Sequence, residues 1–427
     1  MTSAKIIFPQ KGPNSEGHVS SDLTNFDDDA LGNVAKETAQ NSNDAKKNVK
    51  YNLEKKCSEI MDIHDCIDFG DHKDKTLKEF FDTHKRGDKD SFSHNGMKYE
   101  YIQYSDKQDK EAQISIENDS PVKIEYQLKT LDTKDFPGVD DLKRHIQMCF
   151  DVSDSEDEEK FYQKALDTIN KEKIEVLKIS DFNTVGLKFD ETLKRARLNK
   201  QPWLSVLKGS AISSKDTSNS ANLGSHGKGK FSCFHLTNLR TVFYQSRIQD
   251  DNLYFSSKET TVERMFGSRS ILMEHNDPND ENDVYNNIGF YCADYDEGDG
   301  GKEYPVPVRN SDIPNFFGIN EDKTGLDIFI VGSMLSDDYP NWKNEFIAAL
   351  LSKFHVAIAR DEFVAIVDDK EIDSKSMKEI FVDHETIEVD DKQALKEAKW
   401  LFELDSRKKP YTGSRPTVIS DKLKDIP

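Results

Sequence analysis

Three short segments, far apart along the 427-residue chain, place the strongest constraint on its fold. They are residues 32–45 (GNVAKETAQNSNDA), residues 176–187 (VLKISDFNTVGL) and residues 222–234 (NLGSHGKGKFSCF). The first is rich in helix formers, the second is an apolar run that ends in turn residues, and the third is rich in glycine. Their polar groups can act on one ligand only if the fold brings a helix, a strand end and a loop together.

The first segment places two polar side chains on one helix face. Glu37 and Asn41 are four residues apart, so both leave the helix on the same side, about one turn apart. A carboxylate can polarise water toward a phosphoryl group, and an amide oxygen suits Mg²⁺ already carried by phosphates. Glu37 is the candidate general base and Asn41 the candidate metal ligand. For an isolated Glu/Asn pair, an ordinary solvated helix face is the more frequent explanation.

The second segment predicts a buried strand that opens into a turn. Ile174, Val176, Leu177 and Ile179 form a short, mostly β-branched apolar run, and Ser-Asp-Phe-Asn follows it. Asp181 at the strand end could accept a hydrogen bond from an exocyclic amine, which adenine offers where guanine offers an oxygen. Asn183 tolerates the left-handed backbone that such a turn needs, and Gly186 follows. Taken alone, the segment is equally well explained as a strand and an Asx-turn without a ligand.

The third segment imitates a P-loop. Gly224, Gly229 and Lys230 satisfy most of that pattern, but Phe231 follows and has no hydroxyl for Mg²⁺. Residues 213–222 are polar, so the strand that precedes a P-loop is missing as well. We therefore reject the P-loop.

A better interpretation of this segment is G-x-x-G-x-G followed by an apolar-periodic helix over residues 231–239. Backbone N–H groups of the loop and of the helix start would hold the β- and γ-phosphates of a nucleotide, and two lysines would add charge. A Gly/Ser loop without a ligand is the alternative. The candidate binding residues are Gly224, Ser225, His226, Gly227, Lys228, Gly229 and Lys230.

In this order the three segments resemble the boxes of the GHKL ATPase superfamily, which includes gyrases, heat-shock chaperones, histidine kinases and MutL. ETAQNSNDA looks like the ExxxNxxDA core of its first helix, which adds Asp44 to the implied ATP site. The family's second box is usually Asp-x-Gly-x-Gly; here Asn183 stands at the first Gly, and Gly186 comes one residue late.

Two further stretches narrow the resemblance. FSCFHLTNLRTVFYQS at 231–246 is similar to a prokaryotic branch related to MutL and MORC proteins and associated with restriction and phage defence. TGLDIFIVG at 324–332 resembles the strand that closes the ATPase domain in that branch. Gly325 and Asp327 match its third motif, and the alternation of Leu326, Ile328 and Ile330 independently predicts a strand.

The resemblance implies an α+β fold: a Bergerat-type ATPase sandwich, in which helices cover one face of a mixed sheet, followed by a partial transducer-like α/β domain. It implies Mg²⁺-dependent ATP binding and slow hydrolysis that drive a dimerisation switch, with protein partners in a DNA-directed restriction or anti-phage defence system. The alternative is a non-hydrolysing nucleotide-binding scaffold that acts through protein–protein contacts. The presence of Glu37 argues against it, because a pure binder needs no base.

We expect a GHKL-type domain over 1–335 and a transducer-like domain with a tail over 336–427. The strand that should follow the first helix is 121–129, which leaves an insertion at about 50–120 with a helical stretch at 75–85. An ATP lid is expected at about 188–222. The insertion contains four residues of types that can bind zinc, which are Cys57, His64, Cys66 and His72. Their spacing fits no familiar zinc-finger pattern, which argues against a zinc site.

The C-terminal part predicts a helix over 341–354, then two strands around Arg360 and Asp361. In MutL and gyrases a transducer lysine reaches the γ-phosphate; Lys408 and Lys409 are candidates for it here. They belong to one of two short basic clusters, and for either cluster a solvated helix face or tail is the more frequent explanation.

Charge and composition set the remaining limits. The net charge of −21 repels polyanions, so any DNA contact would have to be local. The sequence has no run of about 18 apolar residues and no signal-peptide pattern, so we expect a cytoplasmic protein without membrane contact. The five cysteines are scattered and form no CxxC, which argues against a disulfide framework and a zinc ribbon.

Overall fold

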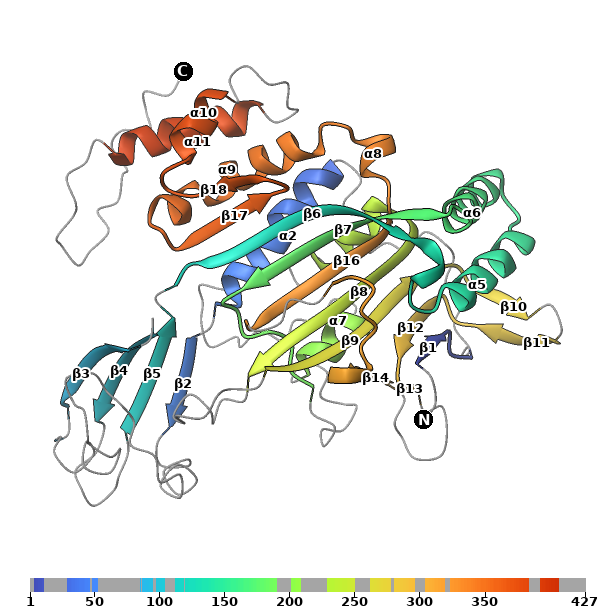
Figure 1. The fold of residues 1–427 in the computed structure, drawn as a ribbon, viewed down its shortest axis with the longest axis horizontal. Coiled ribbons are helices and arrows are strands. Elements are labelled where there is room, and N and C mark those ends of the chain that lie inside the picture. Colours follow the sequence, from blue (N-terminus) through green and yellow to red (C-terminus); the bar gives the residue numbers. More distant parts are fainter. Residues whose placement is uncertain are drawn as a thin grey trace.

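The computed structural model describes residues 4–10, 29–46, 48–52, 85, 87–94, 97–103, 112–118, 120–189, 201–208, 229–249, 262–277, 280–295, 304–318, 323–383 and 392–406. Over these ranges the fold is α+β, built on one large mixed sheet with helices (Figure 1). This confirms the expected α+β class.

The large sheet has ten strands in the order β1-β12-β9-β8-β16-β7-β6-β17-β18, with β15 paired to β9. Its described strand pairs are antiparallel except for β6 and β17, which run parallel. The strands are β1 (Lys5–Ile7), β6 (Val122–Asp132), β7 (Lys173–Phe182), β8 (Thr237–Gln249), β9 (Val262–Ile271), β12 (Ile288–Cys292), β15 (Val308–Arg309), β16 (Gly325–Ser333), β17 (Phe363–Val367) and β18 (Lys370–Ile372).

Strand β7 shows why the centre of this sheet is apolar on both sides. Leu177 and Ile179 belong to the core cluster on one face, and Ile174 and Val176 to the cluster on the other. Alternate side chains of a strand point to opposite faces, so a strand covered on both faces reads as a near-continuous apolar run. The predicted strands at 121–129, 174–181 and 324–332 are confirmed as β6, β7 and β16.

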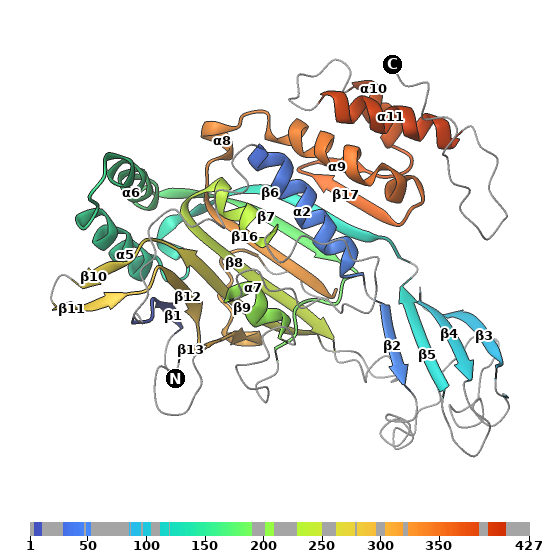
Figure 2. The ribbon, with the colours of Figure 1, turned by 180° about the vertical axis from the view of Figure 1, so that it is seen from behind.

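Helices cover the face of the sheet that carries Leu177 and Ile179, as Figure 2 shows for α2, α7 and α9 in front of the sheet. The buried residues of α2 recur at the 3.6-residue period, so this helix presents one apolar stripe to the sheet. It begins at Asp29, whose carboxylate caps it by accepting from the Gly32 N–H at 2.8 Å. The helices on this face are α2 (Ala30–Asp44), α7 (Pro202–Leu207), α9 (Trp342–Ala359), α10 (Met377–Asp383) and α11 (Lys392–Ser406). The 3₁₀ helix η5 (Gly229–Leu236) lies on the same face.

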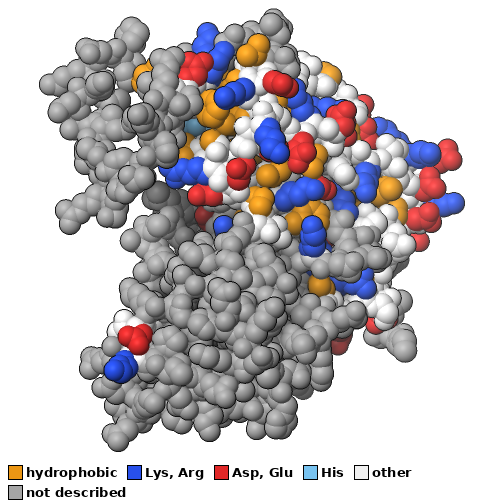
Figure 3. Space-filling view, turned by 60° about the vertical axis from the view of Figure 1, so that its left-hand side comes forward, with side chains coloured by type: hydrophobic (Ala, Val, Ile, Leu, Met, Phe, Trp, Pro, Cys, Tyr) orange, Lys and Arg blue, Asp and Glu red, His pale blue; other side chains and the backbone are white. Residues whose placement is uncertain are grey.

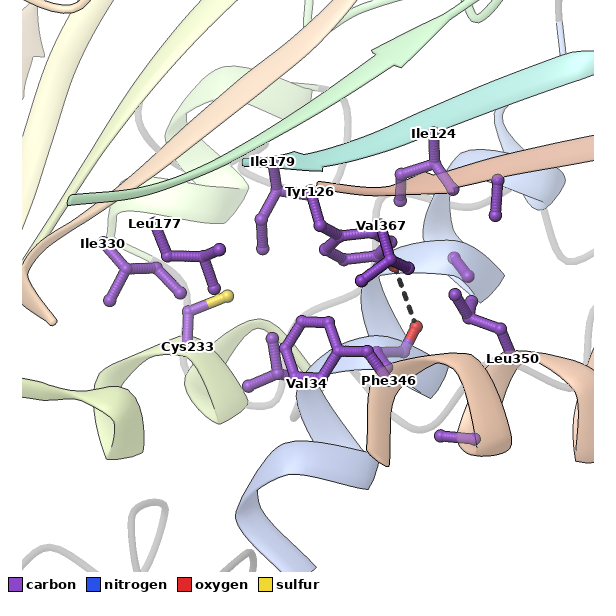
Figure 4. Close-up of a cluster of buried hydrophobic side chains, with 14 of the residues drawn as sticks. Val34, Ile124, Tyr126, Leu177, Ile179, Cys233, Ile330, Phe346, Leu350 and Val367 are labelled. Carbon is purple, nitrogen blue, oxygen red and sulfur yellow. Dashed lines mark hydrogen bonds between the residues drawn. The ribbon is translucent and has the colours of Figure 1, made fainter. Parts of the chain in front are cut away.

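Figure 4 shows how α2, α9 and the sheet share one core. Phe346 of α9 packs edge-on against Tyr126 of β6, with ring centres 5.1 Å apart. The buried Tyr126 hydroxyl reaches α2, where it donates to the Ala35 carbonyl oxygen at 3.2 Å and lies 3.0 Å from the Thr38 hydroxyl. The first helix is therefore fixed to the sheet by both packing and polar contacts.

Helices α5 (Val139–Asp151) and α6 (Glu156–Ile169) belong to the second core cluster, together with β1 and residues 308–317. An acidic run starts α6: Ser155 caps the helix and four carboxylates occupy its first turn, where they complement the helix dipole. Helix α5 follows a turn at Gly138, which has a left-handed φ of 74°.

The expected boundary at residue 335 does not separate two sheets. Strand β17 extends the large sheet by pairing with β6, with Phe363 opposite Val122, and α9 packs against α2. The first of the two strands expected around Arg360 and Asp361 is wrong, because residues 355–359 continue α9. Ile358 is fully buried one turn after Phe354, so the apolar period of the helix continues there.

The described part of the insertion is a second sheet in the order β2-β5-β4-β3, set apart from the large one (Figure 1). Its strands are antiparallel: β2 (Asn48–Asn52), β3 (Lys89–His94), β4 (Met97–Gln103) and β5 (Ala112–Asn118). The helical stretch predicted at 75–85 falls outside the described residues except for Lys85, and so do Cys57, His64, Cys66 and His72.

The expected lid is described only at 188–189 and 201–208. The second range contains α7, whose Trp203 is fully buried in the first core cluster, so this part of the segment is fixed to the core. The helix predicted over 231–239 is wrong beyond Leu236, because Leu239 lies in β8. The β-branched and aromatic residues that follow, TVFY, favour a strand over a continued helix.

Among the helices that the structure describes, none combines the length and apolarity needed to span a bilayer.

Candidate ligand site at the end of strand β7

Asp181 lies at the end of β7 and faces α2 with only 7% of its surface exposed. Its Oδ2 accepts a hydrogen bond from the hydroxyl of Ser42 at 2.9 Å. Ser42 lies on the buried stripe of α2, next to Asn41. The structure therefore brings the first and second sequence segments into direct contact.

The other carboxylate oxygen of Asp181 is held from two sides. Oδ1 accepts from the Thr184 hydroxyl at 2.7 Å and from the backbone N–H of Leu326 at 2.6 Å. A carboxylate has about four acceptor positions, and the described contacts use three of them. Oδ2 thus has one acceptor position that none of the described contacts uses, and an N–H of a ligand could occupy it.

Burial raises the pKa of Asp181, because charge is disfavoured away from water. The hydrogen bonds from Thr184, Leu326 and Ser42 and the positive charge of Arg247 oppose this effect on the pKa, because they stabilise the carboxylate. A buried carboxyl with a perturbed pKa at a strand end is a typical feature of a functional site.

The turn after β7 has the predicted left-handed backbone. Asn183 has φ of 64°, and its side-chain amide donates to the Pro121 carbonyl oxygen at 2.7 Å. Gly186 has φ of 66°, and a Cβ there would lie 2.8 Å from the Arg247 carbonyl oxygen. The packing of the turn against β8 and the start of β6 therefore explains both residues without a ligand.

Gly325 permits the contact between β16 and Asp181. A Cβ at this position would lie 2.1 Å from the main-chain oxygen of Asp181, closer than any real side chain comes. The next residue, Leu326, can therefore bring its N–H to the carboxylate. Gly325 shapes the site by the close approach of two backbones.

The candidate catalytic residues lie along α2 beside this buried contact. Glu37 is half-buried and Asn41 exposed, four residues apart on the helix as predicted. The carboxylate of Asp44 accepts a hydrogen bond from the Gln40 amide at 2.7 Å. Asn41 is thus adjacent in sequence to the Ser42 contact, and Glu37 lies about one helical turn earlier.

The described end of the third segment also reaches α2. Helix η5 begins at Gly229 and packs against α2, and its Phe231 and Cys233 share a core cluster with Val34 (Figure 4). The chain therefore leaves the glycine-rich loop beside the helix that carries Glu37. Gly224, Ser225, His226, Gly227 and Lys228 lie outside the described residues, and so does the side chain of Lys230.

Sequence reasoning missed Ser42, Thr184 and Arg247 as partners of Asp181. For Ser42 a signal existed, because it falls on the apolar stripe of the helix and a buried hydroxyl needs a partner. For Arg247 no such signal existed, because the polar Gln245 and Ser246 come directly before it in β8. The identity of those partners depends on strand pairing, which no local pattern specifies.

A metal ion at this site would have to be bound mainly by the phosphates of a bound nucleotide. Within the described ranges, no three His, Cys, Asp or Glu side chains are placed to hold a metal ion together. Mg²⁺ is typically bound by one or two protein groups together with substrate phosphates, so the single amide of Asn41 fits a phosphate-bound ion rather than a protein cage.

No family model matches this chain, and neither a curated protein nor a solved structure does.

Proposed function

We propose that this chain binds ATP with Mg²⁺ at the end of β7 and hydrolyses it slowly, as a conformational switch of the GHKL type. The environment of Asp181 carries the proposal. Its carboxylate is buried and held by three neighbours, with one acceptor position left on Oδ2. It also lies against the helix that carries a candidate base and a candidate metal ligand.

The remaining acceptor position suits the exocyclic amine of adenine. Guanine would present an oxygen to the carboxylate instead, and a buried acceptor left without a donor is costly. Sites that hydrogen-bond a specific polar group reject analogues that lack it far better than apolar pockets reject a change in size. Asp181 would therefore select adenine, with Ser42, Thr184 and the Leu326 N–H fixing its orientation.

The other residues have three kinds of role under this proposal: chemistry, phosphate binding and shaping of the site. Glu37 would accept a proton from the attacking water, and the Asn41 amide oxygen would contact Mg²⁺ on the phosphates. Backbone N–H groups of residues 224–230 would hold the β- and γ-phosphates, with the charge of their lysines. Asn183, Gly186 and Gly325 would shape the turn and the close backbone contact, since their described surroundings are other parts of the chain.

A Bergerat-type sandwich is consistent with a mixed sheet whose one face is covered by α2 and α9. The place in a DNA-directed restriction or anti-phage defence system rests on the sequence resemblance alone. Positive and negative side chains alternate over the coloured surface in Figure 3, and the net charge is −21. Both observations favour a local DNA contact over a broad cationic one.

Thermal unfolding with nucleotides tests this function. A ligand at a hundredfold excess over its dissociation constant adds about 2.7 kcal/mol to stability, which raises the melting temperature by a few degrees. We expect this shift from ATP with Mg²⁺ and a much smaller one from GTP. In Asp181→Asn the shift from ATP should be lost. The matched control is Asp167→Asn, which should keep the shift, since Asp167 is an exposed carboxylate on α6 that accepts a hydrogen bond from Gln163. Equal shifts from both nucleotides, or none, would rule out the adenine site.

A further inference from the structure

A fully buried ion pair lies behind Asp181, on the face of the sheet away from α2. Arg247 of β8 and Asp327 of β16 have no exposed side-chain surface, and Arg247 Nε lies 3.3 Å from Asp327 Oδ2. Nη2 of the same arginine donates to Asp327 Oδ1 at 3.3 Å. The functional roles proposed above make no use of this pair.

The guanidinium of Arg247 also joins three other parts of the chain. Nη2 donates to the main-chain oxygen of Asp181 at 2.6 Å, and Nη1 donates to the Lys323 carbonyl oxygen. Its central carbon lies 4.9 Å from the centre of the Phe182 ring. One side chain therefore fixes the end of β7 to the start of β16, where Leu326 holds the Asp181 carboxylate.

Stability alone is a poor explanation for such a pair. Removing two charges from water costs several kcal/mol for each ion, and apolar replacements of buried ion pairs are often neutral or stabilising. What an arginine adds is a planar set of donors with fixed directions. Here those donors set the position of the Asp181 backbone relative to β16, at the close backbone approach that Gly325 permits.

We propose that Arg247, held by Asp327, is a positioning residue that sets the orientation of Asp181 and thereby the preference of the site for adenine. This inference rests on the proposed ATP site. In this account the pair acts from the face opposite the ligand and touches no ligand atom. It controls which base binds, and leaves the phosphate contacts unchanged.

The test compares two variants with the whole wild-type chain. The double variant Arg247→Met/Asp327→Leu removes both charges of the pair together, so neither is left buried without the other, and it is expected to fold. Arg247→Lys keeps the charge but loses the forked donors. The matched control is Arg269→Lys: Arg269 is also buried, over the Phe231 ring, but lies on β9, which β8 and β16 separate from β7.

Dissociation constants for ATP, ADP and GTP, with the melting temperature of each unliganded protein, give the readouts. We expect both Arg247 variants to lose at least about tenfold of the ATP-over-GTP preference, since one misplaced hydrogen bond is worth about that factor. Their ATP-over-ADP ratio should stay at the wild-type value, and the control should keep both ratios. A merely structural pair would lower the melting temperature or all affinities alike.

The outcomes separate the two claims. If the wild type prefers ATP over GTP and the folded Arg247 variants keep that preference, the positioning role is overturned while the ATP site stands. If the wild type itself shows no preference for adenine nucleotides, the proposed function falls and the positioning role falls with it. If the double variant does not fold, the ATP-over-GTP preference of Arg247→Lys decides whether Arg247 has the positioning role.

Discussion

Asp181 combines two opposing requirements in one residue. Its burial raises the pKa and disfavours the carboxylate, whereas its contacts with Ser42, Thr184 and Leu326 favour it. An empty site therefore keeps a carboxylate that costs folding free energy at neutral pH. A ligand donor would offset part of this cost on binding, which links occupancy of the site to stability.

The first prediction concerns Asp181→Asn in the unliganded protein. The Asn oxygen can still accept from Thr184 and Leu326, and its NH₂ can donate to the Ser42 oxygen, so every described contact can be kept. We expect the variant to fold and to lose at most about 1 kcal/mol of stability at neutral pH. Urea unfolding of both proteins measures the difference.

The sign of the pH dependence follows from the raised pKa of Asp181. A carboxyl whose folded pKa is raised contributes stability below its ordinary pKa, and this contribution is lost as pH rises through the raised value. The wild type should therefore lose stability relative to Asp181→Asn over that interval. A difference that grows in favour of the wild type with rising pH would contradict the cause assigned to the shift.

The second prediction separates binding from chemistry. Glu37→Ala should bind ATP with unchanged affinity and lose about a hundredfold or more of its turnover, because a general base contributes about that much. Lys36→Ala is the control on the same helix, since Lys36 pairs with Asp29 at 3.3 Å and has no assigned chemical role. Phosphate release and nucleotide titration measure the two quantities. Turnover at the wild-type rate in Glu37→Ala would remove the catalytic role of Glu37.

Single elements with a clear period could be predicted from the sequence, and long-range pairing could not. Helix α2, strand β7 and strand β16 follow from apolar residues at spacings of 3.6 or 2. Residues 355–359 suited a strand by residue type, but the buried Ile358 continues α9. The contact of Ser42 with Asp181 spans 139 residues, so only its helical half had a local signal.

The third prediction tests whether α9 belongs to the same cooperative unit as α2. Phe346 is fully buried between Trp342 and Tyr126, so Phe346→Ala should cost about 3–5 kcal/mol. Val356 lies on the same helix with 42% of its surface exposed, and Val356→Ala should cost about 0.5 kcal/mol or less. Both values come from denaturant unfolding.

If residues 336–427 formed an independent domain, Phe346→Ala would shift a separate transition and leave ATP-induced stabilisation of the first domain intact. In the fold described here β17 pairs with β6, so the unfolding of α9 and of the large sheet should shift together. Two unfolding transitions, of which only one responds to the substitution, would support a domain boundary at residue 335.

At the scale of the whole molecule, the proposed switch requires that ATP favour one association state. A ligand shifts such an equilibrium only through different affinities for the two states. We expect a non-hydrolysable ATP analogue to raise the dimer fraction of the protein and ADP to leave it unchanged. Sedimentation of Glu37→Ala without nucleotide, with ADP and with ATP measures this. A monomer in all three conditions would leave ATP binding possible but remove the dimer switch.

The most direct test of the central claim is base selection at Asp181. Equilibrium titration should give a dissociation constant for ATP at least about tenfold below that for GTP in the wild type, a difference of about 1.4 kcal/mol. In Asp181→Asn the amide NH₂ would face the adenine amine, so tight ATP binding should be lost while the protein stays folded. Unchanged ATP affinity in folded Asp181→Asn would contradict the claim that Asp181 recognises the adenine of ATP.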